Sequence, residues 1–366
     1  MEKKNQVPKY PLLRFPEFTD EWKEVKLGEV CSIRTGKLNA NAMEKDGQYP
    51  FFTCAKEVYR INTFAFSGEA LLISGNGANV GYIHYYNGRF NAYQRTYVLE
   101  QFNQDIRCIQ YLLVEHLSRR IAIEKNEGNT PYIVLSTLTD MLLRLPSLPE
   151  QRKIAALLSL IDERIEVQNA IIKEQEAQKA ALLRRLFDRT LRFPEFTDEW
   201  TQTTIGEICK VSTGEMNTQD KIEDGMYPFY VRSSKIERAN RYTYDGVAIL
   251  TPGDGAIGQI FHYSKGKIAV HQRVYMLTEM QCIPKYLFHC FSARFFGRVN
   301  RMSAKNTVDS VRMNMITDMP IPLPSLAEQK KIAVLLSAID ERIAVETEYA
   351  ALLQKQKAYL LRQMFV

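Results

Sequence analysis

The sequence lacks the motifs that identify many nucleotide-dependent enzymes and the segments that identify membrane and secreted proteins. It contains no GxxxxGKS/T phosphate-binding loop. It has no Pro-Pro pair, so the Asn/Asp-Pro-Pro-aromatic motif of amino-methyltransferases is absent. No run approaches the roughly 18 apolar residues of a membrane span, and the N-terminal MEKKNQVPKYPLL has no apolar core of a signal peptide. We therefore expect a cytoplasmic protein.

Metal-binding and disulfide patterns are missing as well. The cysteines form no CxxC pair and have no histidine nearby at zinc-finger spacing, so we interpret them as reduced thiols. The histidines form no ligand cluster along the chain, and we expect no metal site. The net charge of +6 permits a polyanionic partner without requiring one. An apolar content of 45% and a charged content of 25% are typical of a folded protein, and 366 residues suit two or three domains.

One segment, Gly253–Gly258, matches the GxGxxG pattern of dinucleotide-binding proteins. That interpretation requires a helix after the glycines, but the following Gln259–Val270 has the pattern of a β-hairpin. An earlier copy of the segment has Val80 where Gly258 stands. We therefore interpret these glycines as a tight turn, and the sequence predicts no catalytic residue.

Nearly the whole chain is a tandem repeat. Leu13–Trp22 (LRFPEFTDEW) recurs letter for letter as Leu191–Trp200, 178 positions later. At the same displacement, Ser147–Phe187 recurs as Ser325–Phe365. We call each LRFPEFTDEW segment a clip, because its aromatic residues suit an extended segment lying in a hydrophobic groove. The bodies between clip and helix are rich in short apolar runs bounded by Gly, Asn and Asp, which indicates strands.

The repeated segments Ser147–Phe187 and Ser325–Phe365 have helical periodicity throughout. Ser147 with Glu150, and the equivalent Ser325 with Glu328, have the spacing of a capping box. About 41 residues at ~1.5 Å each make a helix of roughly 60 Å. Each helix has a heptad seam with apolar ends and a partly polar middle, so each needs a partner helix, and the other copy is the obvious one. The repeated acids in IDER fit a solvated face or an interhelical ion pair.

The seam residues are, in the first helix, Ile154, Leu158, Ile161, Ile165, Gln168, Ile172, Gln175, Lys179, Leu182 and Leu186. In the second helix they are Ile332, Leu336, Ile339, Ile343, Glu346, Ala350, Leu353, Lys357, Leu360 and Met364.

The predicted fold class is α+β, with two duplicated domains of short strands, long loops and few short helices, such as Tyr111–Ile121. Two long antiparallel helices forming a coiled coil separate these domains in a pseudo-twofold, circular arrangement. The circle predicts that the C-terminal tail near Phe365 is a spatial neighbour of the first clip near Phe15. In sequence order the predicted segments are an N-terminal segment with a clip (1–22), a first domain (23–145), a central helical region with the second clip (146–200), a second domain (201–323) and a C-terminal helix (324–366).

The repeated SLPEQRKIAALLSLIDERI and SLAEQKKIAVLLSAIDERI segments, the two clips, and the GNGA/GDGA and QRTY/QRVY landmarks of the bodies carry a specific resemblance. Over essentially its whole length the chain resembles the specificity (S, HsdS) subunit of type I restriction-modification systems. The resemblance implies that each body is a target-recognition domain that binds one half of a bipartite double-stranded DNA site. It also implies that the paired helices set the gap and dock two adenine methyltransferase subunits, and through them the restriction subunits. It implies no catalytic residue and no cofactor in this subunit, with S-adenosylmethionine and ATP/Mg in the partners.

Comparison of the two copies sorts the candidate DNA-binding residues, because features shared by both bodies cannot distinguish two different half-sites. Shared residues are candidates for phosphate contacts or for the scaffold, and for the arginines a salt bridge is as good an explanation. They are Thr35, Gly36, Gly75, Gly77, Gln94, Arg95, Thr213, Gly214, Gly253, Gly255, Gln272 and Arg273.

Residues that differ between the copies, or lie in flanking loops, are candidates for base reading, although each of them also suits a solvated loop. They are Arg34, Lys37, Lys56, Arg60, Asn76, Asn79, Tyr93, Asn126, Asn129, Thr130, Ser212, Arg232, Ser234, Lys235, Asp254, His271, Lys305, Asn306 and Thr307. Because the copies differ at these positions, we expect an asymmetric recognition site.

Two other functions remain open from the residues alone. A scaffold protein would use the coiled coil only for assembly and would show no sequence-selective DNA binding after methyltransferase subunits are added. An enzyme with an unrecognised site in a glycine-rich turn would act on a small substrate as an isolated chain.

Overall fold

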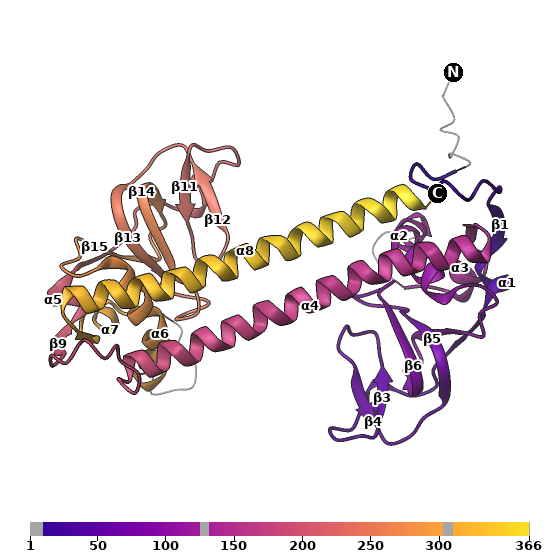
Figure 1. Cartoon of the computed structure of the whole chain (residues 1–366), viewed down its shortest axis with the longest axis horizontal. Helices are drawn as coiled ribbons and strands as arrows, with labels where there is room; N and C mark the ends of the chain where they lie inside the picture. The colour runs from indigo at the N-terminus through magenta and orange to yellow at the C-terminus, as the bar shows by residue number, and fades with distance from the viewer. Residues whose placement is uncertain (1–9, 125–131, 303–309, 366) are drawn as a thin grey trace. The chain divides into compact units, whose positions relative to one another are not determined.

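The computed structural model describes residues 10–124, 132–302 and 310–365. The chain forms two compact units. Unit 1 comprises Met1–Gln168 and Tyr349–Val366, and unit 2 comprises Asn169–Glu348. Each unit contains one copy of the repeated body, and each also contains parts of both long helices, α4 (Leu148–Phe187) and α8 (Leu326–Met364) (Figure 1). The predicted division into five segments in sequence order stays a prediction.

Unit 1 is built on a six-stranded sheet in which all neighbours are antiparallel except β6 and β3. In sheet order its strands are β2 (Ser32–Thr35), β7 (Thr96–Glu100), β5 (Phe66–Ser74), β6 (Ile83–Ala92), β3 (Tyr49–Phe52) and β4 (Tyr59–Ile61). A second, two-stranded sheet pairs β1 (Lys23–Lys26) with β8 (Leu142–Leu145). The short helices are α1 (Leu27–Val30), η1 (Ala40–Ala42) and α3 (Leu135–Thr139), and the longer one is α2 (Ile106–Glu124).

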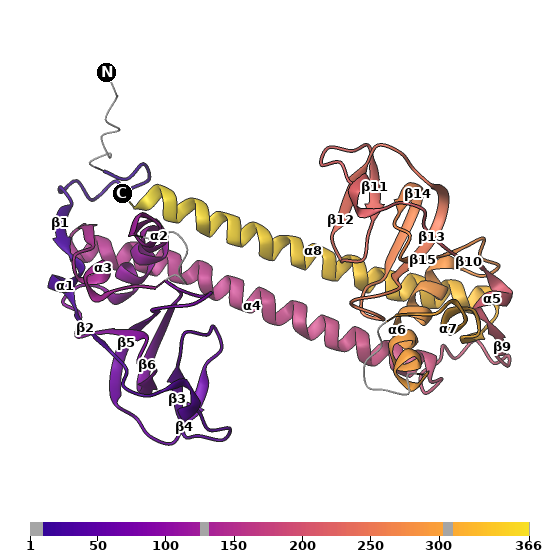
Figure 2. The same ribbon diagram turned by 180° about the vertical axis from the view of Figure 1, so that it is seen from behind.

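Unit 2 repeats this topology element by element. Its six-stranded sheet has the order β10 (Lys210–Thr213), β15 (Val274–Thr278), β13 (Tyr244–Pro252), β14 (His262–Val270), β11 (Tyr227–Tyr230) and β12 (Ile236–Ala239). The two-stranded sheet pairs β9 (Thr201–Thr204) with β16 (Pro320–Leu323). The helices are α5 (Ile205–Ile208), η2 (Thr218–Asp220), α6 (Pro284–Met302) and α7 (Met313–Thr317), and α6 and α7 lie beside the long helices in both views (Figure 2).

One prediction about local structure was too short and another was wrong. The helices predicted at Tyr111–Ile121 and Tyr286–Phe296 are present, but they are the inner parts of α2 and α6, each 19 residues long. The hairpin predicted within Gln259–Val270 is the single strand β14, whose hairpin partner is β13. Gly266 lies within this strand. It lies opposite Gly246 in the strand pair, and both have positive φ angles (+100° and +154°) that favour glycine.

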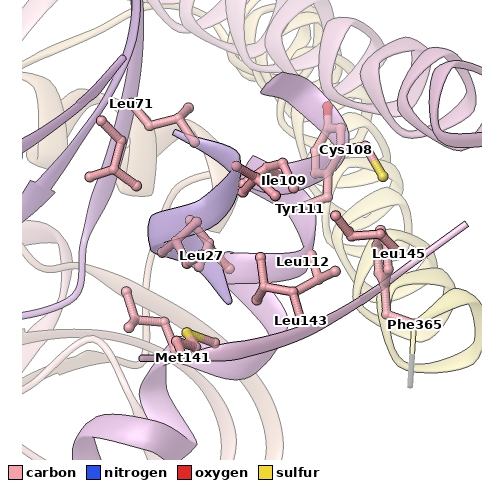
Figure 3. Packing of buried hydrophobic residues seen from close by; sticks show 14 of the residues in the cluster. Leu27, Leu71, Cys108, Ile109, Tyr111, Leu112, Met141, Leu143, Leu145 and Phe365 are labelled. Carbon is pink, nitrogen blue, oxygen red and sulfur yellow. The ribbon is translucent and has the colours of Figure 1, made fainter. Parts of the chain in front are cut away.

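The core of unit 1 lies between the sheet, α2 and segments of both long helices (Figure 3). Leu71 from β5, Tyr111 from α2 and Leu143 from β8 are fully or almost fully buried in it. Phe365, just beyond the end of α8, packs into the same cluster. The core of unit 2 is built in the same way, with Leu186 and Phe187 from the end of α4 in the place of the tail. Each body therefore depends on a helix end that lies outside it in the sequence: the C-terminal tail for the first body, and the end of α4 just before the second clip for the second body.

The first clip lies against the C-terminal tail, as predicted from the circular repeat. The backbone N–H of Leu13 donates to the carbonyl of Gln363 at 2.9 Å. The Trp22 and Phe365 rings meet edge to face, with centroids 6.5 Å apart. Phe15 packs on the same cluster as Phe365. The predicted neighbourhood of Phe15 and Phe365 is confirmed.

A buried ion pair fixes each clip to the start of a long helix. The Arg14 guanidinium donates from Nε and Nη2 to the two carboxylate oxygens of Glu150, each at 2.8 Å. The equivalent Arg192 does the same to Glu328 at 2.9 Å. Ser325 caps α8 as predicted, since its hydroxyl accepts the backbone N–H of Glu328 at 3.4 Å. The carboxylates of Glu150 and Glu328 bind the clip arginines, a contact that the capping-box pattern did not predict. Their burial follows from the same contact: the Glu150 and Glu328 side chains are 0% and 1% exposed.

The predicted pairing of the long helices is confirmed within each unit. In unit 1, Lys357 of α8 forms an ion pair with Asp162 of α4, and in unit 2, Lys179 of α4 forms one with Asp340 of α8. The helices therefore run antiparallel, and the repeated IDER acids form interhelical pairs. Every predicted seam residue is buried or half-buried. Polar residues at seam positions weaken the packing between the helices but fix the register in which the helices pair.

The two interhelical ion pairs differ in the side chain of the repeated body that lies next to the aspartate. In unit 1, the Tyr111 hydroxyl donates to Asp162 at 2.7 Å. The equivalent position in unit 2 is His289, whose Nδ1 lies 3.8 Å from Asp340. Burial lowers the pKa of His289 to about 4; Asp340 opposes this shift, and the nearby Lys179 and Lys285 reinforce it. The imidazole is therefore neutral at pH 7.

Replacing Arg14 by alanine should destabilise unit 1, because it leaves the buried Glu150 carboxylate without its partner. Losing one member of a buried pair costs roughly 3 kcal/mol. Arg14→Lys should recover only part of this, because lysine lacks the planar two-donor edge. Denaturant unfolding followed by the fluorescence of Trp22, in a Trp200→Phe background, measures the effect. Lys153→Ala, which removes the exposed partner of Glu17 in the same clip, is the control and should change little. Equal losses for Arg14→Ala and Lys153→Ala would contradict the role of the buried pair.

His289 should make unit 2 sensitive to acid. An unfolded histidine has a pKa near 6.5, above that of His289 in the fold. The unfolded chain therefore takes up the proton first, and stability present above about pH 6.5 is lost as the pH falls towards about 4. The loss is roughly 3 kcal/mol, at about 1.4 kcal/mol per pKa unit. His289→Tyr, which installs the residue of unit 1, should flatten this dependence in urea titrations between pH 4.5 and 7.5. Parallel pH profiles of variant and wild type would show that His289 is not the source.

Candidate nucleic-acid interface

Three loops that follow strands of the six-stranded sheet of unit 1 contact one another. We call them rim 1: residues 53–56 after β3, 75–79 after β5 and 93–95 after β6. The Asn79 side-chain amide donates to the carbonyl of Cys54 at 3.1 Å, and the Cys54 thiol donates to the carbonyl of Arg95 at 3.3 Å. The Gly75 N–H donates to the same Arg95 carbonyl at 2.8 Å. Loops that are distant in sequence thus form one surface.

The repeated glycines allow the backbones of these loops to touch. A Cβ atom on Gly36 would lie 1.9 Å from the carbonyl oxygen of Ala92, and one on Gly75 would lie 2.3 Å from that of Arg95. Gly214 of unit 2 is equally close to its neighbour, at 2.1 Å from the Val270 oxygen. Any side chain at these positions would push the loops apart. The shared Thr-Gly and GNGA/GDGA landmarks therefore support the loops.

A tyrosine that sequence reasoning left without a role secures each rim. The Tyr97 hydroxyl donates to the Ile133 carbonyl at 2.8 Å, and the Ile133 N–H donates to Gly75 at 2.8 Å. Unit 2 repeats the set: Tyr275 donates to the Val311 carbonyl at 2.9 Å, and Val311 donates to Gly253 at 2.7 Å. The signal in the sequence was the repetition of QRTY as QRVY, which marked the tyrosine without indicating its contact.

The shared candidates of rim 1 line a polar hollow of about 290 Å³. Its lining residues are Thr35, Gly75, Gln94, Arg95, Tyr97 and Ile133. The Gln94 and Arg95 side chains are exposed beside it. The structure thus brings together several residues predicted to contact phosphate or to form the scaffold, with two of their side chains facing solvent.

Rim 2 is the equivalent surface of unit 2 and comprises residues 231–234, 253–257 and 271–273. The Arg232 guanidinium donates from Nη1 to both carboxylate oxygens of Asp254, at 3.2 and 3.3 Å. The Arg273 guanidinium lies 3.9 Å from the same carboxylate. Arg232 and Arg273 remain half or more exposed, so rim 2 presents two cations around one acid.

His271, predicted to read a base, is instead part of the support of rim 2. Its ring is 4% exposed, and burial lowers its pKa. Nδ1 accepts the backbone N–H of Arg273 at 3.0 Å, and Nε2 lies 3.2 Å from the Thr218 hydroxyl. A base contact would require the ring to leave this site.

Two arginines among the base-reading candidates of unit 1 are also held by the protein. Arg60 donates to the carbonyls of Gly47 and Gln48, both at 2.9 Å. Arg238 makes the same pair of bonds in unit 2, so this contact belongs to the shared hairpin. Arg34 lies over the Phe66 ring and forms an ion pair with Glu100 at 2.5 Å. These arginines have structural roles whatever else they contact.

The remaining candidates fall into three groups. Exposed side chains at or beside the rims are those of Lys37, Lys56, Gln272, Ser234 and Lys235. Half-buried or backbone-engaged positions are Asn76, Gly77, Tyr93, Ser212, Thr213 and Gly255. Asn126, Asn129, Thr130, Lys305, Asn306 and Thr307 lie outside the described residues.

Comparison with known proteins gives the same division into two copies. The family model of the type I restriction modification DNA specificity domain matches twice, at residues 19–177 and 197–355. The chain belongs to this family of type I specificity subunits. Members are non-catalytic specificity subunits of restriction-modification complexes. The chain is thus a DNA specificity subunit with one specificity domain in each repeat.

Curated relatives agree with this assignment. The chain is 41% identical over 184 residues to the EcoDI specificity subunit of Escherichia coli, a match covering 49% of this chain and 40% of that one. It is 21% identical over 402 residues to the MjaVIII specificity subunit of Methanocaldococcus jannaschii, covering 95% of this chain and 92% of that one. The chain therefore spans less than half of the first relative and nearly all of the second.

Solved structures share the fold. The S subunit from M. genitalium superposes with a TM-score of 0.69 at 16% identity, covering 98% of this chain and 99% of that one. A chain from a study of the assembly and conformational transition of the type I system gives a TM-score of 0.54 at 17% identity, covering 95% and 98%. At these identities the likeness concerns the fold alone. Within the described residues, no helix is both long and apolar enough to cross a bilayer, and no three metal-ligating side chains gather.

Arg95→Ala should weaken DNA binding to all sequences alike, because a phosphate contact carries no sequence information. The slope of log affinity against log salt should fall in magnitude by about 1. Salt titrations with cognate and unrelated duplexes measure both effects, and Arg273→Ala is the matched variant in rim 2. A change in base preference without a general loss of affinity would show that Arg95 reads sequence.

Proposed function

We propose that each unit of this specificity subunit binds one half of an asymmetric, bipartite DNA site through its rim. The observation that carries the proposal is the duplicated rim, in which the support is shared but the exposed side chains differ. Shared supports such as Gly75 and Tyr97 hold the loops in the same way in both copies. The differing side chains, such as Lys56 against Ser234, then face two different half-sites.

The paired helices α4 and α8 set the gap between the half-sites and dock the methyltransferase subunits. Supporting this, the helices expose apolar side chains at repeated positions. Val167 in unit 1 and the equivalent Val345 in unit 2 are 60% and 64% exposed. Ile171 with Tyr349, and Leu148 with Leu326, are further exposed apolar pairs at equivalent positions, and a group of such side chains suits an interaction surface. Because each position occurs in both copies of the helix, the surface fits two copies of one partner.

The catalytic chemistry belongs to the partners in this proposal. S-adenosylmethionine binds to the two adenine methyltransferase subunits, and ATP with Mg²⁺ binds to the restriction subunits that join through them. This chain acts in the cytoplasm on DNA and supplies the choice of sequence.

Mapping N6-methyladenine across a genome, with and without this gene, tests the proposal. We expect one asymmetric motif of two half-sites with an unread gap, methylated only when the gene is present. A palindromic motif would contradict the asymmetry, and an unchanged methylation map would contradict the function. A pure scaffold predicts no sequence-selective DNA binding by the complex with methyltransferase subunits. An unrecognised enzyme predicts activity from the isolated chain.

A further inference from the structure

The two rims differ at both positions of an ion pair that is present in rim 2. Rim 2 has Arg232 and Asp254 in contact, whereas the equivalent positions of rim 1 are the neutral residues Cys54 and Asn76. Both positions therefore differ together, while the glycines and the QR landmark around them are kept. The supporting backbone is therefore the same in both rims, and the ion pair changes only the side chains on the surface of rim 2.

The contact holds the arginine in one orientation and leaves its recognition edge open. Of the three guanidinium nitrogens of Arg232, Nη1 is the one that donates to Asp254, at 3.2 and 3.3 Å. Among the residues that the structure describes, Nε and Nη2 of Arg232 have no hydrogen-bond partner. Two parallel donors on one planar edge match O6 and N7 of guanine in the major groove. The Arg232 side chain is 50% exposed and the Asp254 side chain 20%, so the acid supports from below while the arginine faces outward.

The carboxylate also separates the roles of two neighbouring arginines. Arg273 lies 3.9 Å from Asp254, has a 63% exposed side chain, and is shared with rim 1 as Arg95. An arginine that occurs in both rims suits a phosphate contact, because phosphates are the same in both half-sites. Arg232 is present only in rim 2, which suits a base that only the second half-site contains.

We propose that Arg232, oriented by Asp254, reads a guanine in the half-site bound by unit 2, and that unit 1 has no equivalent contact. Asp254 is a positioning residue: it limits the rotamers of a flexible side chain before DNA arrives, so less conformational freedom is lost on binding. The inference rests on the proposed function, because it names a contact within it.

The test uses the full chain assembled with the methyltransferase subunits of its own system. Binding is measured against duplexes in which each base pair of the two half-sites is varied in turn. Arg232→Ala should reduce discrimination at one G·C pair of one half-site by about 5- to 150-fold. The other half-site should keep its preferences. Arg232→Cys with Asp254→Asn, which installs the pair of rim 1, should have the same effect.

Asp254→Ala distinguishes positioning from a purely structural role. Removing the acid frees two arginines, so binding to unrelated DNA should persist and its salt dependence should steepen. Discrimination at the same G·C pair should nevertheless fall. Lys210→Ala is the matched control, since it breaks an exposed ion pair with Glu279 at the far end of the same sheet. It should leave the preferences of both half-sites unchanged.

Three results would overturn the inference. Arg232→Ala could weaken all sequences alike, as a phosphate contact would. It could alter both half-sites together, as a folding defect would. Asp254→Ala could keep full discrimination, which would remove its positioning role. In each case a sequence-selective wild-type complex leaves the proposed function standing, whereas a wild-type complex without selectivity refutes both.

Discussion

The structure depends on the burial, in each repeated body, of a helix end that lies outside that body in the sequence. Phe365 and its neighbours complete the core of unit 1, and Leu186 with Phe187 completes that of unit 2. Neither body in sequence order contains these residues. The buried pairs Arg14–Glu150 and Arg192–Glu328 then fix each clip beside the helix start. Because a compact unit must draw on both long helices, the coiled coil is part of each recognition unit as well as a connection between them.

The repeat made the large features of the fold predictable from the sequence. A displacement of 178 positions implied two equivalent bodies, and helical periodicity implied the seam that the structure buries. The clip and the tail met as the circular order required. Features that depend on distant partners were less accessible. The Ser-x-x-Glu pattern is local and indicated a cap, which Ser325 forms in unit 2, but it could not indicate that the carboxylate of Glu150 binds Arg14, 136 residues away. The hairpin expected within Gln259–Val270 was wrong for the same reason, because the local pattern does not show that β14 pairs with β13.

Many of the candidate base-reading residues differ between the copies, and such differences have two different causes. Some differences compensate one another inside the protein. Tyr93 becomes His271 where Ala40 becomes Thr218, and the histidine then contacts the threonine hydroxyl. Such a pair preserves packing and says nothing about DNA. The exchange of Cys54 and Asn76 for Arg232 and Asp254 is different, because its result is exposed. Burial and partners, which the sequence does not show, separate the two cases.

The central claim is that each repeated body carries its own specificity on a common support. A chain in which residues 201–323 replace residues 23–145 tests this most directly, because both bodies are then the same. Assembled with its methyltransferase subunits, this chain should methylate a site made of two copies of the second half-site. Retention of the original first half-site, in a chain that assembles normally, would contradict the claim.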